Sequence, residues 1–128
     1  MSFVHAQFLP EFMLGDDVVM LAMDTAGAAF IHAALNDAVQ HRCSQLEHDG
    51  VTHEFRIEAG AADIELGNGR VEWRLDRSTA VEILDDLAEP TDHAGHRYVD
   101  IRTPASTLVL SYDEHTPEYF EQLRDELR

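Results

Sequence analysis

Residues 53–75 read HEFRIEAGAADIELGNGRVEWRL. Apolar and polar residues alternate along three parts of this stretch, as they do in β-strands that bury only one face. The three parts are residues 53–58, 61–67 and 70–75. Short glycine-containing turns separate them. The stretch therefore predicts a three-stranded antiparallel meander at 53–75, with one apolar face and one polar face.

The turns predict the register of this meander. Asn68-Gly69 is typical of a two-residue hairpin turn, in which the glycine supplies a positive φ. Such a turn pairs Ile64 with Trp73. A similar turn at Ala59-Gly60 pairs Phe55 with Ile64. Both registers place apolar residues on the same face, so each supports the other.

Periodicity in the rest of the chain predicts further strands and helices. We expect strands at 3–9, 18–23, 97–102 and 107–112, and helices from Asp24 or Thr25 to about Arg42, from Asp76 or Ser78 to just before Pro90, and from Thr116 to Leu127. This order predicts an α+β fold in a single domain, 1–128. The expected architecture is a mainly antiparallel β-sheet of about five to seven strands, with two to three helices packed on one face.

Charge is the strongest signal in the composition. The chain has 25 acidic residues against 9 basic residues, all of them arginine, so its formal net charge is -16. Nucleic acid and anionic membranes would be repelled by such a surface, whereas a basic protein would be attracted to it. The alternative is that the acidity only keeps the protein soluble.

Other features of the sequence indicate where in the cell the protein is expected. With a single cysteine, Cys43, the chain cannot form an internal disulfide. The longest apolar run, residues 18–23, is too short to span a bilayer. The beginning of the chain has no secretory signal pattern. These features lead us to expect a cytoplasmic protein that does not bind membranes.

Charged residues on the polar face of the meander form a candidate partner-binding surface. Three carboxylates are expected side by side across its strands: Glu54, Glu65 and Glu72. The neighbouring row contains Arg56, Asp63 and Arg74. Like charges directly opposite each other destabilise a sheet by up to about 1 kcal/mol per pair, so a basic partner or a hard cation would relieve the first row. Alternatively, the glutamates extend into water and the arginines screen them.

Two histidines three residues apart raise the question of a metal site. His93 and His96 lie in the stretch TDHAGHRY, residues 91–98. A zinc site needs three or four converging ligands, and Pro90 and Gly95 favour a loop over a helix that would align the two rings. We therefore expect no metal and no cofactor here.

These observations predict a non-enzymatic, acidic protein-binding module. A bacterial immunity protein or antitoxin that binds a basic partner has this physical profile. One alternative is a small metal-binding or hydrolytic enzyme domain that uses surface carboxylates with His93 and His96. Another is a structural subunit that pairs through an edge strand such as residues 3–9, so the expected state is a monomer or a homodimer.

Overall fold

The computed structural model describes residues 4–13, 16–88 and 95–112, which form eight strands and two helices. In chain order they are β1 (Val4–Met13), β2 (Asp16–Met23), α1 (Thr25–His41), β3 (Cys43–His48), β4 (Val51–Ile57), β5 (Ala62–Gly67), β6 (Arg70–Leu75), α2 (Arg77–Ala88), β7 (Gly95–Asp100) and β8 (Thr107–Tyr112). Neither of the described helices is long and apolar enough to cross a membrane.

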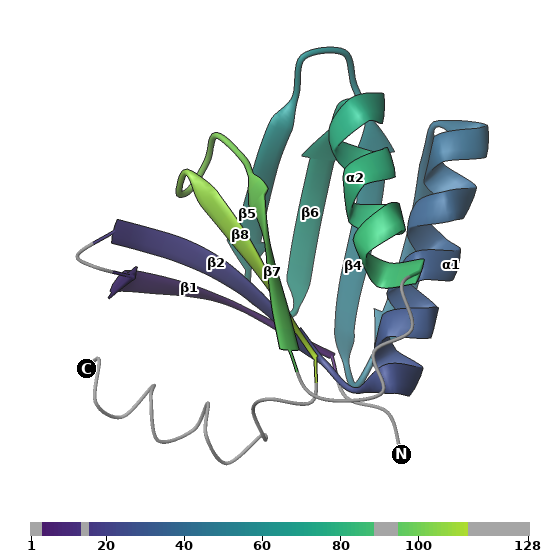
Figure 1. Cartoon of the computed structure of the whole chain (residues 1–128). Coiled ribbons are helices and arrows are strands. Elements are labelled where there is room, and N and C mark those ends of the chain that lie inside the picture. The colour runs from purple at the N-terminus through teal and green to yellow at the C-terminus, as the bar shows by residue number, and fades with distance from the viewer. Residues whose placement is uncertain (1–3, 14–15, 89–94, 113–128) are drawn as a thin grey trace.

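The strands form two sheets (Figure 1), where the sequence predicts one. Sheet A has the order β1-β2-β8-β7, and sheet B has the order β3-β4-β6-β5. The pairs β2–β8 and β4–β6 are parallel, and the other four pairs are antiparallel. The α+β class is confirmed, but both sheets are mixed and the eight described strands exceed the predicted five to seven.

The predicted order of the meander is wrong. The hairpin register is confirmed, because Ile64 pairs with Trp73 across β5 and β6. However, β4 does not pair with β5: Phe55 lies opposite Trp73 in a parallel pair, so β6 occupies the middle position. The apolar pattern could not decide between these orders, since either one puts Phe55, Ile64 and Trp73 on one face.

The connection between β4 and β5 explains the observed order. It passes over the end of β6, and backbone hydrogen bonds hold both of its ends there. The Glu58 N–H donates to the Leu75 carbonyl at 2.9 Å, and the Asp76 N–H donates to the Ala61 carbonyl at 2.6 Å. The turn is therefore wide enough to leave room for a third strand between the two that it joins.

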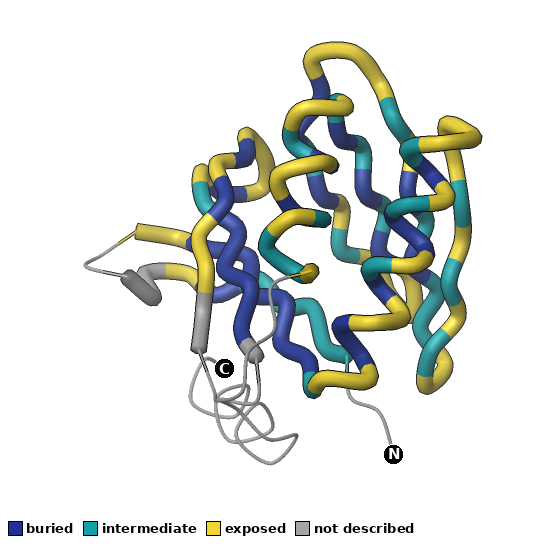
Figure 2. The backbone as a smooth tube through the Cα atoms, turned by 45° about the vertical axis from the view of Figure 1, so that its right-hand side comes forward, coloured by how far each residue is buried: buried dark blue, intermediate teal, exposed yellow. Residues whose placement is uncertain are grey.

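One hydrophobic core joins both sheets and both helices. Figure 1 shows α1 and α2 on the same side of sheet B, which agrees with the predicted packing of helices on one face. Trp73 and Phe55 from sheet B, Leu35 from α1, and Val19 and Leu108 from sheet A are all at most 1% exposed. In Figure 2 the buried parts of the backbone are dark blue. The turns between β4 and β5 and between β5 and β6 are exposed.

The opposite face of sheet A carries a second, smaller apolar cluster. It consists of Leu9, Val18, Met20, Ala22 and Val109, all at most 3% exposed. With both faces buried, β2 is apolar at every position from Val18 to Met23, as the sequence predicts for a strand of this kind. The central strands β2 and β8 of sheet A are thus buried on both faces.

Two parts of the chain differ from the expected elements. Strand β3 was not predicted, because Leu46 is its only large aliphatic residue. Strand β1 continues through Pro10, which an edge strand tolerates because its N–H position can face away from the ladder. The helix expected from Thr116 to Leu127 lies outside the described residues.

The N-terminus of α1 begins at the predicted cap. Asp24 has extended backbone angles, and its Oδ1 accepts a hydrogen bond from the Gly27 N–H at 2.7 Å. We expect Asp24→Ala to lower the free energy of unfolding by about 1 kcal/mol, because that N–H loses its acceptor. Urea denaturation followed by Trp73 fluorescence would measure the change. Asp37→Ala, at an exposed position within α1, is the control and should not destabilise the protein.

Candidate functional site

The candidate site is the face of sheet B that points away from the helices, which we call the outer face. In the row predicted to hold three glutamates, Glu54 pairs with Glu72, and Glu72 pairs with Glu65. The three carboxylates therefore do lie on adjacent strands, but Glu72 is in the middle. Strand β3 extends the row by one residue, because Gln45 pairs with Glu54.

The second predicted row also lies on the outer face. Arg56 pairs with Arg74, and Arg74 pairs with Asp63. Cys43 of β3 completes this row by pairing with Arg56. Arg56 and Arg74 are therefore neighbours, whereas the predicted order would have placed Asp63 between them. Neutralisation of the charges on this face thus depends on ion pairs between residues of different rows.

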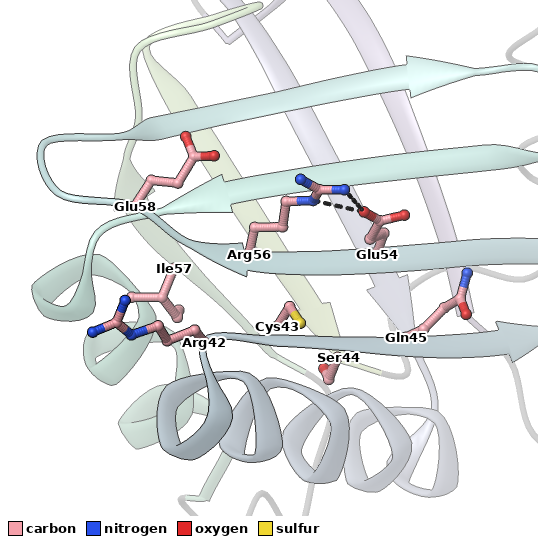
Figure 3. A pocket seen from close by; sticks show the side chains of 8 residues that line it. All are labelled: Arg42, Cys43, Ser44, Gln45, Glu54, Arg56, Ile57 and Glu58. Carbon is pink, nitrogen blue, oxygen red and sulfur yellow. Dashed lines mark hydrogen bonds and ion pairs between the residues drawn. The ribbon is translucent and has the colours of Figure 1, made fainter.

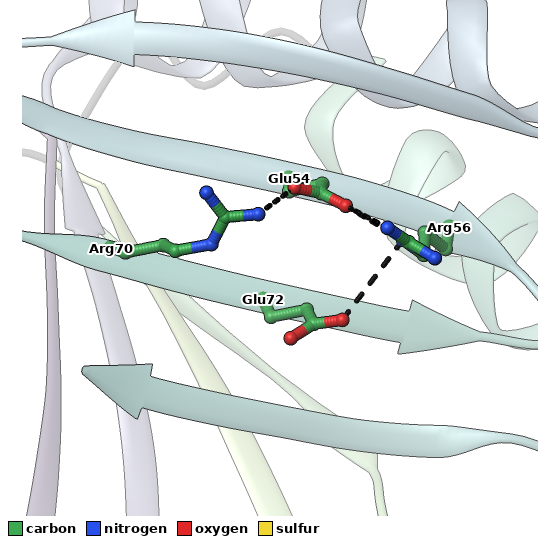
Figure 4. Close-up of polar contacts among 4 residues, drawn as sticks. All are labelled: Glu54, Arg56, Arg70 and Glu72. Atoms are coloured by element: carbon green, nitrogen blue, oxygen red, sulfur yellow. Dashed lines mark hydrogen bonds and ion pairs between the residues drawn. The ribbon is translucent and has the colours of Figure 1, made fainter.

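Glu54 is held by two arginines (Figure 4). Its Oε1 accepts a hydrogen bond from Arg56 Nε at 2.6 Å and forms an ion pair with Arg56 Nη2, also at 2.6 Å, and Arg70 binds its other oxygen. Arg56 also reaches Glu72, with 4.0 Å between Nε and Oε1. The hydrogen bond to the Glu54 carboxylate, together with that charge, raises the pKa of Arg56 above its ordinary value. The repulsion expected between Glu54 and Glu72 is thus screened by arginine, and exposed pairs of this kind contribute little to stability.

The side of the outer face that contains β5 is not neutralised in this way. Glu65 is exposed and, among the described residues, makes no ion pair. Asp63 accepts a hydrogen bond from the Thr103 hydroxyl at 2.7 Å and, in the described structure, makes no ion pair with Arg74. The Nε of Arg74 is buried and has no hydrogen-bond partner in the described part of the chain. Glu65 on β5 and Arg74 on the neighbouring strand therefore carry charges that form no ion pair in the described part of the chain.

A shallow hollow of about 530 Å³ lies at the other side of the outer face, over β3 and β4 (Figure 3). Its lining residues are Arg42, Cys43, Ser44, Gln45, Glu54, Arg56, Ile57 and Glu58. The Cys43 thiol is exposed, while the Arg56 guanidinium points toward Glu54. Within this hollow the guanidinium groups and carboxylates balance each other, and no histidine lines it. The arrangement suits polar contact more than acid–base chemistry.

Sheet B also contains a histidine that the sequence did not single out, on its inner face. His53 is 1% exposed and stacks near Phe55, and its Nδ1 accepts a hydrogen bond from Trp73 Nε1 at 3.3 Å. Burial, reinforced by the nearby charge of His48, lowers the pKa of His53 to about 4. The ring is therefore neutral at pH 7 and enclosed in the core, so it is a structural group and not an accessible base.

The stretch that contains His93 and His96, considered above as a possible metal site, is only partly described. His93 and the side chain of His96 lie outside the described part of the structure. Over residues 4–13, 16–88 and 95–112, no three histidine, cysteine, aspartate or glutamate side chains come together as a metal site would require.

No family model and no curated protein sequence matches this chain. One solved structure has a similar fold. A crystal structure of Drosophila Suppressor of Fused superposes with a TM-score of 0.52 at 8% sequence identity. The match covers 88% of this chain but only 26% of that protein, so the chain spans about a quarter of its length. The likeness to Suppressor of Fused concerns the fold alone.

Sequence reasoning missed one member of the charge network, Arg70. It follows the hairpin glycine Gly69 and lies two residues before Glu72, which is a signal for the same face of the same strand. Its contact with Glu54 depends on the neighbouring position of β4 and β6, where Arg70 pairs with Thr52. The predicted strand order would have placed β5 between Arg70 and Glu54.

Proposed function

We propose that this chain is a non-enzymatic module whose outer face binds a basic region of another protein. The observation that carries the proposal is a sheet face on which neither of the two described helices packs and which has three glutamates on adjacent strands. An apolar sheet face would need a covering layer, whereas this one is charged and can stay in contact with water until a partner binds. The net charge of -16 would attract a basic partner over long range.

The form of this function that we favour is an inhibitor of the immunity or antitoxin type, which covers a basic surface of a toxin. Two features support binding over catalysis. The ionisable groups near β3 and β4 are exposed or paired with each other, and they line a shallow hollow without a histidine. Catalytic acids and bases are more often gathered in an enclosed site that shifts their pKa values.

The ion pairs of the outer face favour two of the three glutamates as contacts for a partner. Glu54 already holds Arg56 and Arg70, so reversing its charge would place three cations together and disturb the face itself. Glu65 has no ion pair among the described residues, and Glu72 has only the 4.0 Å contact with Arg56. These two carboxylates have the most to gain from a basic partner.

The double variant Glu65→Arg/Glu72→Arg tests the proposal. We expect it to fold normally and to lose at least 90% of a basic partner that the unmodified protein captures from its native cells. Capture would be measured by quantitative mass spectrometry at two salt concentrations, because a charge-driven complex weakens as salt rises.

The matched control is Asp37→Arg/Asp85→Arg, which changes the net charge equally at exposed positions on the two helices. The control should retain the partner. If both double variants lose it equally, net charge and not the outer face drives association. If neither loses it, the proposed surface is wrong.

A further inference from the structure

The edge of sheet B at β5 is only half covered. Strand β5 is the edge strand on the side of the sheet nearest to sheet A (Figure 1). Residues 102–103 pair with its first half. The Ile64 N–H donates to the Thr103 carbonyl at 2.9 Å, and the Arg102 N–H donates to the Ala62 carbonyl at 2.7 Å. Pro104 follows, has no N–H to donate, and ends this pairing.

The second half of β5 extends beyond the residues that pair with 102–103. Alternate backbone groups of this half face away from β6. Because backbone groups alternate along a strand, the N–H and C=O of Leu66 point the same way as those of Ile64. Glu65 instead pairs toward β6, opposite Glu72. Among the described residues, no backbone hydrogen bond to Leu66 from outside sheet B is present. Strand β1 lies near β5 here, and Phe8 and Leu66 line the same hollow, so an added strand would lie between Leu66 and Phe8.

A hollow of about 430 Å³ lies against this half of the edge, and its lining is of two kinds. Phe8, Ile64, Leu66 and Pro104 supply an apolar side. Glu65 and Arg74 supply a charged side, which belongs to the outer face. Apolar and charged side chains thus lie next to each other along this half of the edge.

We infer that β5 accepts an extended peptide segment of a partner as an additional strand, with alternating apolar and basic side chains. The alternation follows from the pleat, since neighbouring side chains of the added strand point to opposite faces. One set would face Phe8 and Pro104. The other set would extend the row that contains Glu72 and Glu65, and basic side chains complement the carboxylate of Glu65. This inference rests on the proposed function and specifies how the basic partner is held.

A synthetic peptide tests the mode of binding without altering the protein. The probe is an eight-residue peptide of alternating valine and arginine, blocked at both ends, studied at 150 mM salt by fluorescence anisotropy. Two versions carry N-methyl groups, one on every valine nitrogen and the other on every arginine nitrogen. In an added strand only one of these two sets of amides faces β5.

Strand addition predicts a split between the two methylated peptides. One should bind within about threefold of the unmodified peptide, and the other should bind at least tenfold more weakly, because it cannot form the backbone hydrogen bonds. Hydrogen exchange should show at least tenfold slower exchange at the Leu66 amide when the unmodified peptide is bound. Equal affinities of the two methylated peptides, an unprotected Leu66 amide or absence of binding would each overturn the inference.

Protein variants test the charge contact. Glu65→Arg should weaken binding of the unmodified peptide at least tenfold, whereas Glu47→Arg should change the affinity for this peptide less than threefold. Glu47 is the matched control because it is exposed and lies on β3, at the far edge of the same sheet. Equal weakening by both variants would show general attraction to an acidic protein and would reject the site. A peptide-free dimer with a protected Leu66 amide would assign the edge to a second copy and also reject it.

Failure of this inference differs from failure of the proposed function. If the peptide does not add to β5 but Glu65→Arg/Glu72→Arg still loses the native partner, then the partner uses the outer face without strand addition. If the peptide adds to β5 while that double variant keeps its native partner, then the edge is competent but the proposed function is wrong.

Discussion

Acidification from pH 7 to pH 4 is expected to remove about 3 kcal/mol of stability through one side chain, His53. The pKa of this ring is lowered from 6.5 to about 4 in the folded protein, and one pKa unit corresponds to roughly 1.4 kcal/mol. Between these two values the unfolded chain binds a proton that the folded chain does not. The contribution is therefore fully present above pH 6.5 and is lost as the pH falls toward 4.

Urea denaturation at several pH values between 7.5 and 4 would measure this loss, with Trp73 as the reporter because it is the only tryptophan. His53→Leu is the comparison variant, since its side chain cannot be protonated. The difference in stability between the two proteins should shift in favour of the variant by about 3 kcal/mol over this range. The carboxyl of Asp76, whose pKa is lowered by hydrogen bonds from Thr79, titrates below most of this range and is common to both proteins. The same pH dependence in both proteins would contradict the assignment.

Replacing Trp73 with alanine should cost about 3–5 kcal/mol, which is a large part of the stability of a typical domain. The Trp73 ring is 1% exposed and stacks on Phe55 with 5.5 Å between ring centroids. It lies on the central strand β6, between β4 and β5, so the surrounding side chains cannot easily close the cavity. Urea denaturation followed by circular dichroism would give the change in the free energy of unfolding.

Trp73→Phe separates packing from the hydrogen bond to His53. Phenylalanine keeps an aromatic ring in the core but removes the donor at 3.3 Å from His53 Nδ1. We expect Trp73→Phe to lower the free energy of unfolding clearly less than Trp73→Ala does, because most of the buried apolar surface remains. A cost equal to that of Trp73→Ala would mean that the hydrogen bond, and not the ring's packing, dominates at this position.

Much of the fold follows from local patterns in the sequence. The hairpin at Asn68-Gly69, the cap at Asp24 and the continuous apolar run of β2 each depend on a few neighbouring residues, and the structure confirms them. The strand order was not predictable in this way. Apolar alternation places a residue on a face but does not choose its neighbouring strand, so β4 could be placed on either side of the hairpin.

The candidate site was predictable to a similar degree. Alternation alone puts Glu54, Glu65 and Glu72 on the polar face in either strand order. The ion pairs were not predictable, because Arg70 reaches Glu54 only when β4 and β6 are neighbours. The division of sheet B into a neutralised side at β4 and an unpaired side at β5 is therefore a result of topology. It could not be seen in the composition of the sequence.

The parallel pairing of β2 with β8 has a consequence for synthesis on the ribosome. Strand β2 ends at Met23, while β8 begins only at Thr107, yet the two lie side by side at the centre of sheet A. At translation rates of roughly 5–20 residues per second, the apolar residues of β2 wait for seconds before their partner strand is made. During that interval β2 can pair with β1, but its other edge is unpaired and hydrophobic, which is the kind of segment that chaperones bind in a growing chain.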